Sequence, residues 1–484
     1  MKILILQLAR LGDVYMTWPV VRALKRQNPG CEVHMLVRPR FQAACNGLEA
    51  LDRVHLLPTE KILSPLIKPE FDLESSLNCV DEIVETLAAE KYDRIVNLSF
   101  SPVSSYLASF LGPSAQVSGF SRHSDGYLHL TDDVSRYFWA QVGPGFPNRV
   151  HIVDLFGGVA GVDFAPEDFR LPQVELTKPI EGDYFVLHIG ASEQHKQVSP
   201  GLWSRLITEF ESLRPGMKWV LIGSSAEREI AQQLEKSEVG DRILNRVGQT
   251  ELHEIFSYLQ YSQGLIGADS APMHMIPFVD QKALCLSLGH VKFWETGPIT
   301  LGSAILRLQS EMEISAQDLA RLVKEWSEEK ITSRDTRVYR AVEAIPRFEN
   351  STQETHFAWD LVRALYMGAA FPINSDMGFY KACLRMFEAN QVAVENLQKR
   401  TAAKREILTS ILDRVDELFF AIVKQEPSTV PFFRWYQAEK TRIQPGSFEQ
   451  IAQDTLIIHE VFHSLLKKYL LEEDVRRVEM HGNL

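Results

Sequence analysis

The chain has 484 residues, of which 45% are apolar and 24% charged, and its formal charge at pH 7 is -12. This composition excludes a disordered, collagen-like or membrane-spanning protein, and at roughly 100 to 200 residues per domain the length predicts about two to four domains. The acidic balance argues against a general nucleic-acid-binding protein. Five cysteines are scattered without a CxxC pair, which disfavours a disulfide framework and a zinc-thiolate site and predicts a reducing, cytoplasmic location.

The apolar run near the amino terminus, residues 3–6, is short and leads into Gln7 without a small-residue cleavage site. We therefore interpret it as a first buried strand rather than as a secretion signal. No later stretch approaches the roughly 20 apolar residues that a membrane-spanning helix needs. Any membrane contact is expected to be peripheral, on the inner face of the cytoplasmic membrane.

Up to about residue 300, short apolar and β-branched runs alternate with amphipathic segments, which is typical of βα units and a mostly parallel sheet. The first series of strands is expected at residues 2–8, 31–37, 53–57, 93–98 and 115–119, with helices at 14–27, 77–90 and 103–111. A proline-containing segment at 164–179 predicts a linker. The second series of strands is expected at residues 184–189, 218–222, 264–266 and 282–286. The pattern predicts two doubly wound domains that face a cleft, with a ligand at the carboxyl ends of the strands.

From about residue 315 the strand pattern is expected to end. Apolar residues at helical spacing occur at 319–327, 357–367, 379–388, 393–423 and 451–471. The predicted domains are therefore 1–165, 180–314 and 315–484, of which the last is a mainly helical extension of unknown role. The extension is also a candidate surface for oligomerisation.

Two strand-to-helix turns carry residues suited to catalysis or phosphate binding. Asp13 follows the first strand beside Gly12, where an acid can cap the helix or act as a general base on an acceptor hydroxyl. The loop 188–196 follows the first strand of the second series and contains Ser192 and Lys196. A hydroxyl and a lysine at a strand end suit a phosphate group, although the Walker pattern is missing and Lys196 can equally be a solvated loop residue.

A third turn lies in residues 264–274, where a buried strand ends in Asp269 and Ser270 and a helix begins near Pro272. Free backbone amides at this helix start, around Ser270 and Ala271, form a natural site for a diphosphate. The alternative is structural: Asp269 or Ser270 caps the helix, and His274 is a satisfied, partly buried histidine.

Together these segments resemble glycosyltransferase family 9, the heptosyltransferases of the GT-B fold. The resemblance spans residues 1–328 and rests on Leu-Gly-Asp at 11–13 with Thr17 and Pro19, on the loop 188–196, on Leu-Ile-Gly at 221–223 with Glu227, on Val-Gly-Gln-Thr at 247–250, and on Gly-Ala-Asp-Ser-Ala-Pro-Met-His at 267–274. It implies an α/β protein that transfers a sugar with inversion from an ADP-sugar, usually ADP-heptose, and that requires neither a metal nor a cofactor.

The resemblance also implies that domain 1–165 binds the acceptor, that domain 180–314 binds the nucleotide sugar, and that individual residues have the following roles. Asp13 would be the catalytic base, while Lys196 would neutralise the departing diphosphate, which Ser192 also binds. Glu227 matches the ribose-binding acid of the family, and Thr250 lies in the loop that flanks the base. The other candidates for donor binding are Asp269, Ser270, Ala271 and His274, and those for acceptor binding are Arg10 and Thr17.

The sequence departs from the family pattern at three places. Ala271 stands where the family commonly has Gly, Ala191 precedes Ser192 in place of a second hydroxyl, and residues 289–294 replace a usual Gly-Pro-Thr turn. The amide of Ala271 remains available, so diphosphate binding is expected to survive these changes. The identity of the donor sugar is left open.

The acceptor is suggested by a basic amino-terminal region within an acidic chain. Its cations are Arg10, Arg22, Lys25, Arg26, Arg38 and Arg40. They suit a phosphorylated lipopolysaccharide core at a membrane surface, or they simply cover the exposed face of one helix. Two further alternatives are a protein acceptor recruited by the helical extension and a catalytically inactive family member that acts as a binding module.

A hypothesis of another class comes from the string His459-Glu460-Val461-Phe462-His463 in a helical context. The H-E-x-x-H spacing places both histidines one turn apart on one helix face, as in zinc proteases. The Gly and third His of metzincins are missing, so a helix-surface or capping role is the alternative. His459 and His463 are therefore weak candidates for metal ligands.

Overall fold

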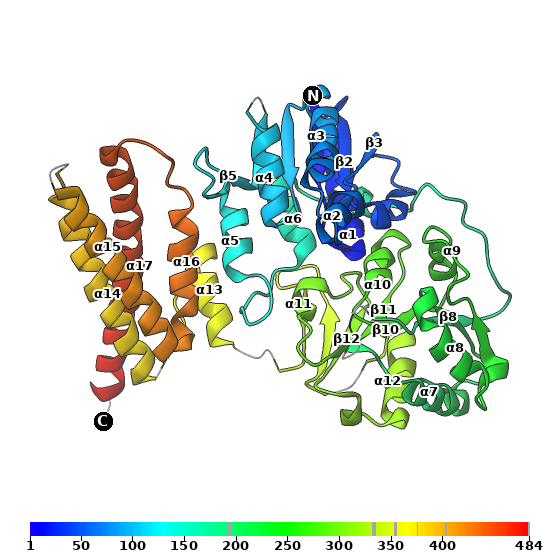
Figure 1. The fold of residues 1–484 in the computed structure, drawn as a ribbon. Helices are drawn as coiled ribbons and strands as arrows, with labels where there is room; N and C mark the ends of the chain where they lie inside the picture. The colour runs from blue at the N-terminus through cyan, green and yellow to red at the C-terminus, as the bar shows by residue number, and fades with distance from the viewer. Residues whose placement is uncertain are drawn as a thin grey trace. The chain divides into compact units, whose positions relative to one another are not determined.

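The structure is a computed structural model of residues 1–484 (Figure 1). It describes residues 1–113, 115–191, 193, 196–331, 335–352, 356–374, 376–401 and 404–482, with side chains up to residue 473. The chain forms two compact units. The first contains Met1–Ser99, Ser114–Gln116 and Arg149–Glu354, and the second contains Phe100–Pro113, Val117–Asn148 and Thr355–Leu484.

The first unit begins with a parallel sheet whose strands lie in the order β3-β2-β1-β4. These strands are β1 (Lys2–Leu6), β2 (Glu32–Val37), β3 (Arg53–Leu56) and β4 (Arg94–Asn97). The helices around them are α1 (Leu11–Gln27), α2 (Thr59–Ile67), α3 (Leu73–Ala89) and α6 (Ile152–Ala160). All four apolar residues of β1 after Lys2 are fully buried, because a central parallel strand is covered on both faces.

The second sheet of this unit has the order β14-β13-β12-β11-β10-β7-β8-β9. Its strands are β7 (Tyr184–His188), β8 (Lys218–Ile222), β9 (Ile243–Asn245), β10 (Leu265–Ala268), β11 (Ala283–Leu288), β12 (Ala304–Leu308), β13 (Val338–Ala341) and β14 (Phe348–Glu349). Its helices are α7 (Pro200–Leu213), α8 (Arg228–Glu235), α9 (Ile255–Gln260), α10 (Ala271–Met275), α11 (Phe293–Thr296) and α12 (Ala316–Ser327). Phe185, Trp219 and Trp326 stack within its core.

The two predicted series of βα units are thus confirmed, but the expectation that strands end near residue 315 was wrong. Strands β13 and β14 pair antiparallel beside β12, and α12 packs on α7. Both strands are short, with four and two residues, so their sequence carries almost no periodicity. The helical region starts at α13 (Phe357–Met367) instead.

The second unit joins this helical region to part of the predicted first domain. Its elements are α4 (Pro102–Leu111), β5 (Gln116–Arg122), β6 (Leu128–Leu130), α5 (Asp133–Gln141), α13, α14 (Met377–Gln398), α15 (Arg405–Gln425), α16 (Val430–Lys440) and α17 (Phe448–Gly482). The long segment 393–423 is two helices rather than one, and Figure 1 shows α14, α15 and α17 side by side. The short 3₁₀ helices of the chain are η1 (Pro39–Cys45), η2 (Pro166–Phe169), η4 (Ser225–Glu227), η5 (Gly240–Arg242), η6 (Ile276–Phe278), η7 (Glu311–Glu313) and η9 (Pro427–Thr429).

Long-range contacts explain why residues 100–148 belong with the carboxyl-terminal helices. Arg136 on α5 forms an ion pair with Glu439 on α16 at 3.2 Å, and Arg434 donates to the carbonyl of Trp139 at 3.0 Å. The predicted domain 1–165 is corrected accordingly, because residues 100–113 and 117–148 belong to the second unit, and the boundary predicted at 315 moves to residue 354. Within the part of the chain that the structure describes, no helix is both long and apolar enough to cross a bilayer.

The glycine before β10 provides a test of this core. Gly264 has a φ of +136°, and a Cβ atom there would lie 2.5 Å from Trp326 Cη2 and 2.9 Å from the carbonyl of Lys282. Gly216 also has a positive φ of +83° but faces open space. We expect Gly216→Ala to lower the free energy of unfolding by about 1 to 2 kcal/mol, from backbone strain alone. Gly264→Ala should lower the free energy of unfolding by at least about 2 kcal/mol more, because the new methyl group also overpacks against Trp326 and Lys282. Urea denaturation of both variants measures the difference, and equal losses would contradict the packing shown here.

Candidate functional site

Three of the predicted site segments follow strands at points where the order of each sheet reverses. The turn before α1 follows β1, which lies between β2 and β4. The loop 189–199 follows β7 and the turn at 269–270 follows β10, and β7 and β10 are neighbours in the second sheet. In open α/β sheets such reversal points are where ligands bind.

Asp13 is the third residue of α1, and its Oδ2 accepts a hydrogen bond from the backbone N–H of Arg10 at 2.9 Å. Burial raises the pKa of the Asp13 carboxyl to about 6. The hydrogen bond and the charge of Arg10 oppose this rise, while the charge of Asp269 adds to it. A carboxylate with this pKa is ionised at neutral pH and is a stronger base than an exposed aspartate.

Thr17 lies one turn further along α1 and is fully buried. Its hydroxyl donates to the carbonyl of Asp13 at 2.8 Å and accepts from the side chain of Gln7 at 3.0 Å. The predicted contact of Thr17 with an acceptor is therefore wrong for this structure. Thr17 instead links β1 to the first turn of α1 and so holds Asp13 in place.

His274 on α10 packs directly against the start of α1. A Cβ atom at Gly12 would lie 2.6 Å from Cδ2 of His274, so only glycine allows this approach. Burial lowers the pKa of His274 to about 3, which keeps the ring neutral. The contact supports the structural interpretation of His274 that the sequence left open.

Asp269 directly follows β10 and receives a hydrogen bond from the side chain of Thr296. Burial raises the pKa of the Asp269 carboxyl, and the Thr296 hydrogen bond and the charges of Lys196 and Arg10 act in the opposite direction. The charge of Asp269 therefore raises the pKa of Asp13, and Arg10 stabilises the charge of both carboxylates.

Ser270 occupies the N-cap position of α10, but its side chain makes no capping hydrogen bond. Its hydroxyl donates to the carbonyl of Ala268 at 3.1 Å and lies 3.0 Å from Nδ1 of His188. The capping role weighed for Ser270 is therefore not realised by its side chain. The amide of Ala271 lies at the start of this helix, which is only five residues long.

Lys196 lies in the same region, with its side chain only 12% exposed. Its Nζ forms an ion pair with Glu193 at 3.0 Å, and its charge lowers the pKa of Asp269. Lys196 is therefore not a freely solvated loop lysine. Ser192 lies outside the described residues.

Glu227 lies against the ends of β7 and β8. A Cβ atom at Gly190 would be 3.0 Å from Cδ of Glu227, and one at Gly223 would be 3.2 Å from its Oε2. Ser224 donates to Oε2 of Glu227 at 2.8 Å. An acid at the end of the second strand of a Rossmann-like unit is well placed for ribose hydroxyls.

Thr250 follows a turn that is tied to the same strand end. Gly248 has a φ of +66° and donates its N–H to the carbonyl of Gly223 at 2.9 Å, while Arg228 donates to the carbonyl of Gly248 at 3.2 Å. Thr250 itself is partly exposed beyond this turn. It is available to a ligand that contacts Glu227.

Half of the predicted basic region is structural. Arg22 is almost fully buried and pairs with Glu49 at 3.0 Å, while it also donates to the carbonyls of Asp168 and Arg170 in the 164–179 segment. Lys25 and Arg26 also form ion pairs with acids of the same unit. The prediction that these three cations contact the acceptor is therefore corrected. They form structural contacts that hold the linker and α1 together.

The remaining cations are Arg10, Arg38 and Arg40. Arg38 and Arg40 follow β2, the neighbour of β1, so they lie at the same edge of the sheet as the turn with Arg10. Nε of Arg38 is buried and has no hydrogen-bond partner among the described residues. Arg40 lies over the ring of Phe41, with 4.5 Å from Cζ to the ring centroid.

The H-E-x-x-H string lies on α17, where its two histidines face different surroundings. His459 is buried, with Nδ1 2.7 Å from Oδ1 of Asn390 and Nε2 3.2 Å from the hydroxyl of Tyr436. Both ring nitrogens are therefore engaged in hydrogen bonds. His463 stacks on Phe387 at 4.2 Å between centroids. The arrangement favours the structural interpretation over a zinc-protease site.

Two residues near the site were not predicted from the sequence. Thr296 bonds to Asp269, and His151 donates through Nε2 to the carbonyl of Gly297 at 3.0 Å. Both contacts join segments that are far apart in the chain, so no local sequence pattern predicts them. The departure of residues 289–294 from the family pattern was the only indication that this region differs.

Comparison with known proteins agrees with this geometry. Residues 80–312 match the model of glycosyltransferase family 9 (heptosyltransferase). Lipopolysaccharide heptosyltransferase 1 of Campylobacter coli is 22% identical over 289 residues, which are 57% of this chain and 80% of that protein.

Solved structures give the same fold. A family 9 glycosyltransferase of Veillonella parvula has a TM-score of 0.52 at 18% identity and covers 68% of this chain and 97% of its own. The ADP-heptose lipopolysaccharide heptosyltransferase II of E. coli has a TM-score of 0.50 at 16% identity, with coverage of 68% and 99%. Residues 80–312 of this chain are therefore similar to glycosyltransferase family 9, the two sheets have the GT-B fold, and the protein is a glycosyltransferase.

Proposed function

We propose that the protein transfers a heptose or a related sugar, with inversion, from an ADP-sugar to a phosphorylated glycan such as a lipopolysaccharide core. The observation that carries this proposal is the partly desolvated carboxylate of Asp13, with a pKa of about 6, at the strand-order reversal of the first sheet. The names of the Campylobacter coli and E. coli proteins, both lipopolysaccharide heptosyltransferases, support the choice of sugar and acceptor.

In this mechanism, Asp13 takes the proton of the acceptor hydroxyl as that oxygen attacks the anomeric carbon. The bond from this carbon to the diphosphate oxygen breaks on the opposite face, and ADP leaves with both electrons of that bond. Lys196 is the cation that offsets the charge on the departing diphosphate, since it already lies close enough to lower the pKa of Asp269.

The donor is held by the second sheet. Glu227 binds the ribose hydroxyls, and Thr250 lies beside the base, because both are at the end of β8 and the turn bonded to it. Asp269, oriented by Thr296, receives hydroxyls of the sugar. Ser192, Ser270 and the amide of Ala271 remain candidates for the phosphates.

The acceptor is held by the first sheet. Arg10, Arg38 and Arg40 are the cations left at the edge that carries Asp13, and guanidinium groups bind phosphate in a bidentate manner. This arrangement suits a phosphorylated glycan better than an uncharged one. A protein acceptor, recruited by the second unit, is the competing possibility, and an inactive binding module is opposed by the presence of both Asp13 and Lys196.

A donor-binding experiment tests the nucleotide. Thermal shift of the purified protein against ADP, GDP, UDP and CMP should show selective stabilisation by ADP, because a ligand of the folded state raises the melting temperature. Lys196→Ala should lose most of this shift. Lys178→Ala, which removes an exposed lysine of the linker, should keep it. Equal shifts with all four nucleotides would contradict an ADP-sugar donor.

The pH dependence of transfer tests the catalytic base. A general base works when deprotonated, so kcat/KM should fall as the pH falls through about 6. Asp13→Asn should lower kcat by at least about 100-fold while ADP binding persists. Since Arg10 lowers the pKa of Asp13, Arg10→Gln should move the acidic limb to higher pH, whereas Arg40→Gln should leave its position unchanged. Retained turnover in Asp13→Asn would rule out this role.

A further inference from the structure

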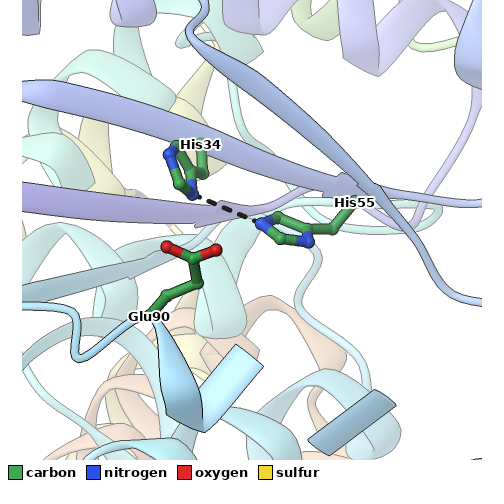
Figure 2. A group of neighbouring side chains, drawn as sticks. All are labelled: His34, His55 and Glu90. Atoms are coloured by element: carbon green, nitrogen blue, oxygen red, sulfur yellow. Dashed lines mark hydrogen bonds between the residues drawn. The ribbon is translucent and has the colours of Figure 1, made fainter. Parts of the chain in front are cut away.

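A second group of titratable side chains lies at the opposite end of the first sheet from Asp13. Figure 2 shows His34 on β2, His55 on β3 and Glu90 at the end of α3 pointing toward one another. One ligand atom from each lies within 4.8 Å of the others. Within the described part of the chain, no other trio of histidine, cysteine or acidic side chains converges in this way.

The strand register explains why the two histidines meet. His34 pairs with Arg53 and Leu36 pairs with His55, so the two rings lie on the same face of neighbouring parallel strands. Each histidine is the third residue of its strand, and Glu90 lies shortly before the amino end of β4. His34 is fully buried and His55 is 8% exposed, so the ring atoms face the interior.

The spacing of the two imidazole nitrogens is that of ligands in a tetrahedral metal site. Nδ1 of His34 and Nε2 of His55 are 3.3 Å apart, and the Tyr92 hydroxyl is 2.9 Å and 3.0 Å from them. Ligands at about 2.0 to 2.1 Å from a tetrahedral zinc ion lie about 3.3 Å from one another. The two imidazole nitrogens therefore already have the separation that zinc requires.

A carboxylate outside the cluster orients one of the imidazoles. Nε2 of His34 lies 3.1 Å from Oε1 of Glu32. A hydrogen on Nε2 that bonds to this carboxylate leaves the lone pair of Nδ1 directed at the cluster. Metal-binding histidines commonly donate their other N–H to a carboxylate in this way.

We propose that His34, His55 and Glu90, with Tyr92 beside them, bind a zinc ion that ties β2, β3 and the α3–β4 connection together. Two imidazoles with oxygen ligands favour zinc over calcium or magnesium, which prefer oxygen alone. The site is at the amino ends of the strands, so the ion would stabilise the acceptor-binding sheet and would take no part in sugar transfer.

Glu90 also interacts with two cations. It forms ion pairs with Lys2 at 2.7 Å and with Arg53. Binding of zinc exchanges the pair with Arg53 for a bond to the metal, because the side chain of Arg53 is 55% exposed and can turn to solvent. The pair with Lys2 can be kept through the second oxygen of Glu90.

Metal binding is tested on the full-length protein after treatment with a chelator. Zinc should bind with a stoichiometry of one and raise the melting temperature, and cobalt should give the visible absorption of a tetrahedral site. His55→Gln should weaken zinc binding at least tenfold, whereas His55→Cys should retain it because a thiolate is also a zinc ligand. Glu32→Gln should weaken it by about 10- to 100-fold.

His463→Gln is the matched control, because it removes a histidine of the H-E-x-x-H string and should leave zinc binding unchanged. Loss of zinc in His463→Gln but not in His55→Gln would overturn the proposal and place the metal on α17. Absence of zinc binding in the wild-type protein would also overturn it. If His55→Gln does not fold, the cobalt absorption spectra of the wild-type protein and of His55→Cys are compared instead. Replacing a nitrogen ligand by sulfur must change the absorption, so identical spectra would contradict His55 as a ligand.

Discussion

The close packing of α1 on α10 is the contact on which the catalytic arrangement depends. Gly12 lets the ring of His274 approach to a distance that a Cβ atom would forbid, and this contact brings the first turn of α1 next to the end of β10. Asp269 then lies close enough for its charge to raise the pKa of Asp13. A bulkier residue at position 12 would separate the base from the donor sheet without changing any charged group.

Two acids and two cations make up the charge of this site. Burial raises the pKa of both Asp13 and Asp269, and Arg10 and Lys196 counter that rise by favouring the ionised carboxylates. Departure of a diphosphate would draw Lys196 toward the new negative charge and weaken its support of Asp269. The proton that Asp13 gains from the acceptor would meanwhile remove the repulsion between the two acids. Transfer and charge balance are therefore coupled in the proposed mechanism.

The sequence predicted the βα alternation well, because buried parallel strands such as β1 and β7 are continuous apolar runs. Local pattern and family resemblance both pointed to Asp13, Lys196 and Asp269 in turns that follow strands, whereas Glu227 was predicted from the resemblance alone. The predictions from the sequence failed for features that long-range packing determines. Three features depend on contacts between distant segments: the joining of residues 100–148 to the helical unit, the pairing of β13 and β14 beside β12, and the buried role of Arg22. The spacing of apolar residues within one segment does not show which distant segment it contacts.

The two ends of the first sheet differ in how far their polar side chains are satisfied. At the carboxyl ends, Arg38 keeps a buried Nε without a partner among the described residues, and Asp13 keeps a raised pKa, so polar groups there are left ready for a ligand. At the amino ends, the His34 and His55 rings and the Tyr92 hydroxyl contact one another, and Glu90 is paired with cations. Strain and desolvation at a ligand site lower stability, and a fold tolerates them when another region is held firmly. A metal at the amino ends would supply that restraint in the sheet that carries the catalytic base, at a distance from the reacting atoms.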